Sequence, residues 1–245
     1  MPFTISHIAI VLPFTCKQRP YLSLTGLIIG AMAPDFLYFV LFNPYFDGGH
    51  SWWGIFAYDI PLSLALAFLY HEVALPALVR YLPAWAGSRL HHFRYFHWGS
   101  YFRRHYLVVI GSVIAGTLSH FFLDAFTHGN GYFVQLMPFL QGDVQVFGQT
   151  MEAWYLMQYI TSLAGLLLLF YFFMKIPADP LPAGQPARNK AIFWLLTIAV
   201  TSIILLLYQQ QPLLYRKSID YLAIVMAAIF YGFFTVVLGK KLIRL

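Results

Sequence analysis

Six long runs of apolar residues constrain this chain more than any other feature of its sequence. They cover Leu22–Phe42, Trp52–Leu75, Tyr106–Phe126, Tyr155–Met174, Ala191–Tyr208 and Ile219–Leu238. A helix needs about 20 mostly apolar residues to cross the hydrocarbon core of a bilayer. The runs are too long for core strands and lack the period-two alternation of half-buried strands. They therefore predict an all-α, polytopic membrane helix bundle with about six transmembrane helices.

The composition predicts a single integral membrane domain over residues 1–245. Of these residues 60% are hydrophobic and 10% are charged, whereas roughly a quarter of the residues in a soluble domain are charged. We expect residues 1–174 to carry the functional site, residues 175–190 to form a proline-rich linker, and residues 191–245 to form a helix pair. Pro34 and Pro61 interrupt two apolar runs, so a kink or local unwinding is expected at each. The single cysteine, Cys16, excludes an internal disulfide and a cysteine-only metal site.

The basic residues predict the orientation in the membrane. If the segment before Leu22 lies in the cytoplasm and the spans alternate, 13 of the 15 Lys and Arg residues fall on the cytoplasmic side. Only Arg216 and Lys217 fall outside, which agrees with the excess of Lys and Arg in cytoplasmic loops. The C-terminus is then cytoplasmic. Topology thus accounts for the net charge of +6, and no nucleic-acid partner is predicted.

Residues 1–14 form an additional short element, which we expect to belong to the mature fold. As a helix they would be roughly 20 Å long, which is short for a span. They could lie in the membrane interface, or insert from the outer side and turn at Lys17–Pro20. Insertion would place His7 at mid-depth.

Ionisable residues inside these apolar runs are the main indication of function. Asp35, Asp59, His120 and Asp124 lie within runs, where an unpaired charge costs several kcal/mol. His50 and a second histidine, His128, lie just beyond the ends of runs. At 1.5 Å per residue, these side chains all fall in the outer half of the membrane or near its midplane. The sequence therefore predicts one polar site, built from several segments.

The spacing of HFFLDAFTH strengthens the prediction of a metal site. His120, Asp124 and His128 are four residues apart, so one helical face can direct all three side chains into one cavity. Gly129–Gly131 then ends the helix and lets His128 bend toward the site. Nitrogen and oxygen ligands of this kind suit Zn²⁺, with Mn²⁺ or Fe²⁺ as alternatives. We expect one to three ions, with Asp35 or Asp124 able to bridge two of them.

Each of these residues also has a simpler structural explanation. A lone histidine in a membrane more often packs and forms a hydrogen bond than binds a metal, which applies to His7 and His50. Asp35 and Asp59, each beside a proline, could cap a broken helix. Asp59 could instead hold a ligand imidazole from behind.

A second histidine group, in RLHHFRYFHWGSYFRRH, is interleaved with Arg and aromatic residues. It favours a basic, aromatic segment at the cytoplasmic interface that contacts anionic lipid.

Several stretches carry a family resemblance. MPFTISH at the start, GLIIGAMAPDFLYF at 26–39, the His50 region and GTLSHFFLDAFTHG at 116–129 resemble the DUF4184 family of bacterial membrane proteins. More remotely, the pattern is similar to the membrane-bound metal-dependent hydrolases described as LexA-binding inner-membrane proteins. More remotely still, it resembles the zinc-dependent phospholipase C and P1-nuclease fold. That last likeness implies His7, Asp35, His50, His120, Asp124 and His128 as metal ligands. The later His and Glu of that fold have no full counterpart, since only Glu152 and Gln158 are available.

From the residues and the resemblance together we expect a metal-dependent hydrolase in the bacterial inner membrane. Its substrate would be a phosphoester in a lipid or lipid-linked molecule, reached from the outer side, and Asp35 would act as general base as well as ligand. Two alternatives remain open. One is a transporter in which Asp35, Asp59 and Asp124 relay ions or protons, and the other is a non-catalytic scaffold with a structural metal.

Overall fold

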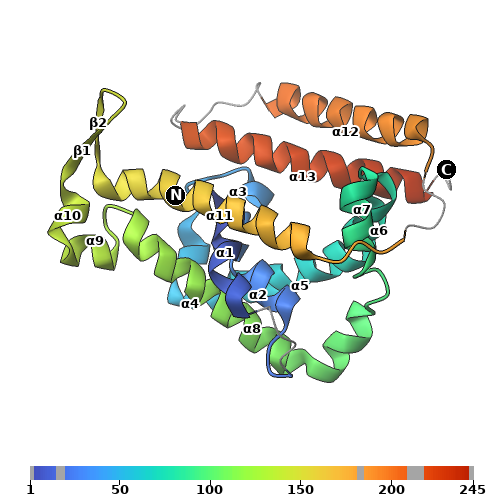
Figure 1. Ribbon diagram of the computed structural model, residues 1–245, viewed down its shortest axis with the longest axis horizontal. Coiled ribbons are helices and arrows are strands. Elements are labelled where there is room, and N and C mark those ends of the chain that lie inside the picture. The colour runs from blue at the N-terminus through green and yellow to red at the C-terminus, as the bar shows by residue number, and fades with distance from the viewer. Residues whose placement is uncertain (1–2, 15–19, 181–184, 209–217, 243–245) are drawn as a thin grey trace. The chain divides into compact units, whose positions relative to one another are not determined.

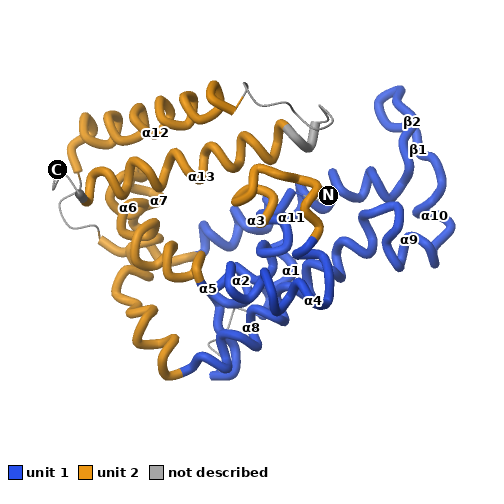
Figure 2. Tube along the Cα trace, turned by 180° about the vertical axis from the view of Figure 1, so that it is seen from behind, with its two compact units in different colours: residues 1–35, 48–64, 105–175 blue, residues 36–47, 65–104, 176–245 orange. Residues whose placement is uncertain are grey.

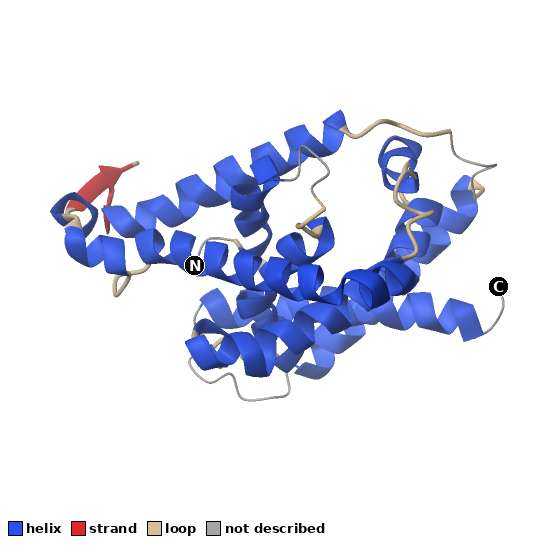
Figure 3. Ribbon diagram, turned by 90° about the horizontal axis from the view of Figure 1, so that it is seen from below, coloured by secondary structure: helices blue, strands red, loops and turns tan. Residues whose placement is uncertain are grey.

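Helices dominate the structure, a computed structural model that describes residues 3–14, 20–180, 185–208 and 218–242 (Figure 3). Five helical segments of the described chain are long and apolar enough to cross a membrane: Trp52–Tyr81, Trp98–Leu136, Ala153–Lys175, Ala187–Tyr208 and Tyr221–Lys241. A bent helix pair within residues 24–41 makes a sixth candidate span. The predicted all-α, polytopic membrane bundle is thus confirmed, and the protein is an integral membrane protein.

The chain divides into two compact units, each assembled from separate stretches (Figure 2). Unit 1 comprises residues 1–35, 48–64 and 105–175, and unit 2 comprises residues 36–47, 65–104 and 176–245. Unit 2 therefore draws on the predicted site-bearing part as well as on the C-terminal helix pair. The description of residues 1–245 as one domain stays a prediction.

Unit 1 contains the short N-terminal helix, the candidate span Ala153–Lys175 and parts of the candidate spans Trp52–Tyr81 and Trp98–Leu136. Its elements are labelled in Figure 1. Its N-terminal helix runs through η1 (Thr4–His7), α1 (Ile8–Val11) and η2 (Leu12–Phe14). The remaining elements lying wholly or partly in this unit are α2 (Leu24–Gly30), α3 (Ala33–Leu41), η3 (Asp47–His50), α4 (Trp52–Gly54), η4 (Ile55–Asp59), α5 (Ile60–Leu69), α8 (Trp98–Thr127), α9 (Tyr132–Leu136), α10 (Pro138–Gln141), β1 (Asp143–Val146), β2 (Gln149–Glu152) and α11 (Ala153–Lys175). η1 and α1 pack against α11, and α1 also contacts α2. The N-terminal segment is thus part of the helical packing of unit 1.

Helices α2 and α8 meet at glycines, which lets their backbones touch. A Cβ atom added to Gly30 would collide with the Val113 carbonyl oxygen, and one added to Gly116 would collide with the Leu27 carbonyl oxygen. Small residues permit such close approach of membrane helices. The Thr117 hydroxyl donates a hydrogen bond of 3.2 Å to the Gly30 carbonyl across the same contact. This packing brings the C-terminal end of α2 against the middle of α8.

Both prolines coincide with irregular backbone, as predicted. Pro34 is the second residue of α3, and the chain bends by 61° between α2 and α3. Proline is tolerated in a first helical turn because the N–H that it lacks has no intrahelical partner there. Pro61 is the second residue of α5, which follows the π-helical turn η4 directly. In that case the span widens locally but is not broken.

Unit 2 holds the C-terminal helices α12 (Ala187–Tyr208) and α13 (Ser218–Leu242), which pack against each other. It also contains η5 (Tyr70–Ala74), α6 (Leu75–Tyr81) and α7 (Ala84–His91). The Tyr81 ring stacks on Phe193 with centroids 4.1 Å apart. The indole of Trp194 donates a 3.0 Å hydrogen bond to the Tyr81 carbonyl. These contacts attach α12 to the end of α6.

Several details differ from the sequence expectations. α8 begins at Trp98 rather than Tyr106, but His105 has non-helical backbone angles (φ −132°, ψ 29°), so the predicted start coincides with a kink. Residues 143–152, which lie between two predicted spans, form a β-hairpin that was not predicted from the sequence. The expected turn at Lys17–Pro20 and the expected positions of Arg216, Lys217 and Arg244 fall largely outside the described residues.

Candidate metal centre

Four of the predicted ligands meet in unit 1, although three separate stretches of chain carry them. Asp35 lies in the first turn of α3, and His50 is the last residue of η3. His120 and Asp124 lie one turn apart on α8. The chain bends by 61° between α2 and α3. Asp35 follows this bend and is fully buried.

The atoms of these four side chains are closely spaced. The Nε2 atoms of His50 and His120 are 3.2 Å apart. Asp124 Oδ2 lies 3.3 Å from His120 Nε2 and 3.6 Å from His50 Nε2. Asp35 Oδ1 lies 3.3 Å from His50 Nε2 and 3.6 Å from His120 Nε2. The two imidazole nitrogens therefore face each other. Each aspartate places one carboxylate oxygen close to both of these nitrogens.

Surrounding groups fix the orientation of two of these side chains. His120 Nδ1 lies 2.9 Å from the Ala31 carbonyl oxygen, which can only accept a hydrogen bond. Nδ1 therefore carries a proton, and in the neutral ring Nε2 presents its lone pair to the site. The Thr4 hydroxyl donates a 2.9 Å hydrogen bond to Asp35 Oδ2, leaving Oδ1 directed at the histidines. These contacts of Asp35 are with side chains of the site and not with backbone N–H groups of a helix end, so they do not indicate a capping role.

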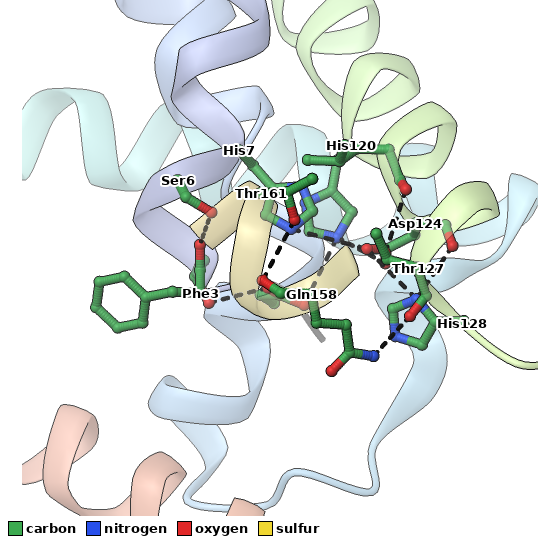
Figure 4. A network of polar contacts seen from close by, with 12 residues as sticks. Phe3, Ser6, His7, His120, Asp124, Thr127, His128, Gln158 and Thr161 are labelled. Carbon is green, nitrogen blue, oxygen red and sulfur yellow. Dashed lines mark hydrogen bonds and ion pairs between the residues drawn. The ribbon is translucent and has the colours of Figure 1, made fainter. Parts of the chain in front are cut away.

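His7 borders the same group from the N-terminal helix (Figure 4). Its ring stacks on His120 with centroids 3.9 Å apart, and its Nε2 lies 3.7 Å from Asp124 Oδ1. The Phe3 N–H donates a 2.8 Å hydrogen bond to Ser162 Oγ, which fixes η1 on α11. Burial is the main reason that the pKa of His7 falls to about 3, and the neighbouring His120 ring lowers it further. The fully buried His7 ring is therefore neutral.

His128 lies at the edge of the group, just past the end of α8. Its Nδ1 is 3.2 Å from the Asp124 carbonyl oxygen and 3.5 Å from Asp124 Oδ1. It belongs to neither of the two three-residue sets of possible ligands that can be drawn among the described residues. The spacing argument thus placed His128 correctly beside Asp124, but the ring lies against the α8 backbone.

Asp59, predicted as a partner for a ligand imidazole, is fully buried at the end of η4. Neither of its carboxylate oxygens forms a hydrogen bond with any residue that the structure describes. For His120, the Ala31 carbonyl is the group that holds the ring from behind. Asp59 therefore does not hold a ligand ring by hydrogen bonding.

Sequence reasoning missed the supporting groups Thr4, Ala31 and Gln158. The amide of Gln158 donates a 2.6 Å hydrogen bond to the Thr127 carbonyl and so attaches α11 to the end of α8 (Figure 4). Gln158 was considered only as a counterpart of a ligand in a distant fold. The sequence does contain a signal for Gln158, because it is a polar residue within the apolar run 155–174. It contains no signal for a backbone carbonyl such as that of Ala31. Glu152, the other counterpart, is an exposed residue of β2.

The second histidine group does not form a comparable cluster among the described residues. Its first three histidines lie in unit 2, whereas His105 is at the start of a stretch of unit 1. His92 pairs with Asp179 at 3.2 Å, where both side chains are largely exposed. His91 is buried in α7. The expectation that this segment contacts anionic lipid stays a prediction.

The donor set fits a divalent transition metal. The ligand atoms of His50, His120 and Asp124 lie within 4.8 Å of one another, as do those of His7, Asp35 and His120. Zinc bonds of about 2.0–2.1 Å in a tetrahedron separate ligand atoms by about 3.3–3.4 Å, close to the 3.2, 3.3 and 3.6 Å separations within the first set. His120 Nδ1 donates its hydrogen bond to the Ala31 carbonyl. Only Nε2 of His120 is left to coordinate a metal, so this ring can bind one ion. The two sets are therefore alternative descriptions of one primary position.

Buried polar atoms that form no hydrogen bond point to the same position. His7 Nε2, Asp35 Oδ1 and Asp124 Oδ1 are buried and form no hydrogen bond with the described part of the chain. Buried polar atoms normally find a partner, and those that do not call for an explanation such as an ion. One side of the group is closed, with His7, Asp35 and His120 at 0% exposure, while the side chains of Asp124, His50 and His128 are 13%, 21% and 29% exposed. The group thus has one accessible side.

The family model described as a domain of unknown function (DUF4184) matches residues 1–242. The chain belongs to the DUF4184 family. The match covers the site residues and also the C-terminal helices, which lie beyond the stretches that carry the resemblance in the sequence. Comparison with curated proteins and with solved structures found no match.

Proposed function

We propose that this DUF4184 protein binds a divalent metal ion, zinc in the first place with Mn²⁺ or Fe²⁺ as alternatives, and uses it to hydrolyse a phosphoester. The observation that carries the proposal is the triangle of His50 Nε2, His120 Nε2 and Asp124 Oδ2, with sides of 3.2, 3.3 and 3.6 Å. Three protein ligands leave a fourth position for water or substrate, which is the pattern of catalytic zinc sites.

Each side chain has a distinct role in this proposal. A bound ion would supply Lewis-acid chemistry, lowering the pKa of water toward neutrality and polarising a phosphoryl oxygen. Asp35, whose Oδ1 lies 3.3 Å from His50 Nε2, would accept a proton from the attacking water. The water oxygen bonds to phosphorus, the ester P–O bond breaks, and the alcohol leaves with a proton from solvent on the exposed side of the site. Thr4 would keep the Asp35 carboxylate in place through its 2.9 Å hydrogen bond.

A lipid or lipid-linked substrate fits the surroundings of the site. His120 and Asp124 lie within the candidate span Trp98–Leu136, and His50 lies just before the candidate span Trp52–Tyr81. The His50 ring lies 6.1 Å from the Phe121 ring, which in turn contacts the exposed Trp52. A substrate held in the bilayer can reach such a position without crossing water.

A structural metal is the second candidate, because a specific contact favours it. Asp35 Oδ1 lies as close to the two histidine nitrogens as Asp124 Oδ2 does, at 3.3 and 3.6 Å. If Asp35 were a fourth ligand, the coordination would be closed, which is typical of structural zinc.

Hydrolysis assays on metal-loaded protein test the proposal. Purified protein in nanodiscs would be incubated with a chromogenic phosphodiester and with phospholipids carrying different headgroups. We expect hydrolysis that chelation abolishes, that zinc restores, and that Asp35→Asn reduces by about 10²-fold or more while the metal stays bound. Stoichiometric metal without hydrolysis of any of these substrates would favour the structural role.

We further propose that the protein resides in the bacterial inner membrane with its C-terminus in the cytoplasm, where basic residues meet anionic lipid. The support is the distribution of basic residues, among which Arg94, Arg103 and Arg104 are exposed. A tag fused to the C-terminus should resist externally added protease in spheroplasts. Replacing Arg94 and Arg103 by Gln should reduce the anionic phospholipid that co-purifies with the protein.

A further inference from the structure

The β-hairpin of unit 1 has an unusual tip. Its strands β1 and β2 pair in antiparallel register from Asp143–Glu152 to Val146–Gln149, which leaves a two-residue turn. The turn residues Phe147 and Gly148 both have positive φ, at 50° and 79°. Asn-Gly is the usual sequence for such a turn, and a bulky residue with positive φ is uncommon. Phe147 thus occupies a position that its backbone disfavours, with its side chain 103% exposed.

The hairpin has one apolar and one polar face. Directly paired residues point to the same side of a ladder, so the half-buried Val144, Met151 and Val146 share one face, on which Gln149, the partner of Val146, is the one polar residue. The opposite face is polar and consists of Asp143, Gln145, Thr150 and Glu152. A lone two-stranded hairpin is marginally stable in water. An apolar face that continues into an exposed phenylalanine therefore calls for a covering apolar phase.

The position of the hairpin in the chain identifies that phase. It follows the candidate span Trp98–Leu136 and precedes the candidate span Ala153–Lys175, so it lies at a membrane surface. Residues 129–152 contain no Lys or Arg, which excludes electrostatic attraction to anionic lipid as the main contact. Exposed Tyr132 and Phe139 lie in the helices just before the hairpin (Figure 1). Aromatic residues are enriched at the membrane–water interface.

We propose that the hairpin is a membrane anchor that inserts Phe147 into the interfacial region of the lipid bilayer. The apolar face of Val144, Val146 and Met151 rests on the lipid, and the polar face remains in water. This contact explains why an apolar side chain takes the strained turn position. It also holds the chain between α8 and α11 at the bilayer surface, independently of any chemistry at the metal centre.

Site-specific fluorescence distinguishes the two faces. The chain has a single cysteine, Cys16, so Cys16→Ser followed by Phe147→Cys gives one labelling position for the fluorophore NBD. Gln145→Cys in the same background is the matched control, because it lies two residues away on the polar face. Both proteins would be placed in phosphatidylcholine nanodiscs with and without doxyl-labelled lipid, and iodide would serve as the aqueous quencher.

The fluorescence of a label at position 147 should be blue-shifted, and doxyl lipid should quench it whereas iodide should not. A label at position 145 should be quenched by iodide and not by doxyl lipid. Equal access of iodide to both positions would overturn the proposal. So would a label at position 147 that is shielded from iodide but insensitive to doxyl lipid, because that result would indicate a protein contact.

Discussion

His50 and His120, which lie 70 positions apart in the sequence, turn their Nε2 atoms toward each other at 3.2 Å. The Ala31 carbonyl accepts a hydrogen bond from His120 Nδ1–H, so in the neutral ring His120 Nε2 offers a lone pair to its neighbour. The pair can then share one proton, or both rings can bind one cation. The adjacent Asp35 and Asp124 carboxylates favour positive charge between the rings.

Thr4 should support the site through Asp35. Thr4→Val removes the 2.9 Å hydrogen bond to Asp35 Oδ2 and leaves a buried carboxylate oxygen unpaired, which costs about 1–3 kcal/mol. We expect a lower melting temperature of the metal-free protein and metal affinity reduced by about 10-fold or more. Thr4→Ser, which keeps the hydroxyl, should restore both. A stability of Thr4→Val equal to that of wild type would contradict this role.

The glycine contact between α2 and α8 should be equally sensitive. Gly30→Ala places a methyl group against the Val113 carbonyl, and overpacking of this kind costs about 1–3 kcal/mol. Because Ala31 follows Gly30, the shift should also move the carbonyl that orients His120. The matched control is Gly111→Ala on α8, where no atom lies within 4 Å of the added Cβ. Thermal unfolding in detergent should separate the two variants, and equal melting temperatures would argue against the contact.

His128 and His50 should differ in importance. His128 Nδ1 faces the Asp124 backbone carbonyl at 3.2 Å, whereas His50 Nε2 faces both carboxylates and His120. His50→Ala should therefore weaken metal binding far more than His128→Ala, as measured by competition with a fluorescent chelator. If His128→Ala proved the more damaging, the ion would lie closer to the edge of α8.

Removing the metal should destabilise the wild-type protein. An ion present at about 100 times its Kd contributes about 2.7 kcal/mol to the folded state, and the metal also neutralises the buried carboxylates. Chelation should lower the melting temperature of wild type but leave that of His120→Ala unchanged. An identical response of both proteins to chelation would show that the effect does not come from this site.

The sequence predicted the fold well because hydrocarbon imposes simple rules on length and polarity. The apolar runs locate the spans, and the i, i+4 spacing of His120 and Asp124 predicts their shared face. Counting residues along the runs also predicts that Asp35 and His50 lie in the outer half of the membrane or near its midplane, and their side chains lie 3.3 Å apart.

The orientation of His120, the hairpin and the division into units depend on contacts that no pattern of residues in the sequence predicts. The Ala31 carbonyl orients His120 because the packing at Gly30 and Gly116 brings α2 close to α8. The hairpin was missed because its turn is Phe-Gly rather than Asn-Gly, a choice that we attribute to the membrane. Unit 2 could not be predicted as a unit, because it joins residues 36–47 and 65–104 to the C-terminal helices.

Elemental analysis of the purified protein tests the central claim most directly. Wild type should contain about one transition-metal ion per chain, since His120 can serve only one ion. His120→Ala and Asp124→Ala should lose it, while His91→Ala, which removes a buried histidine of unit 2, should keep it. Wild-type protein that carries no stoichiometric metal after purification and reloading with zinc would contradict the account.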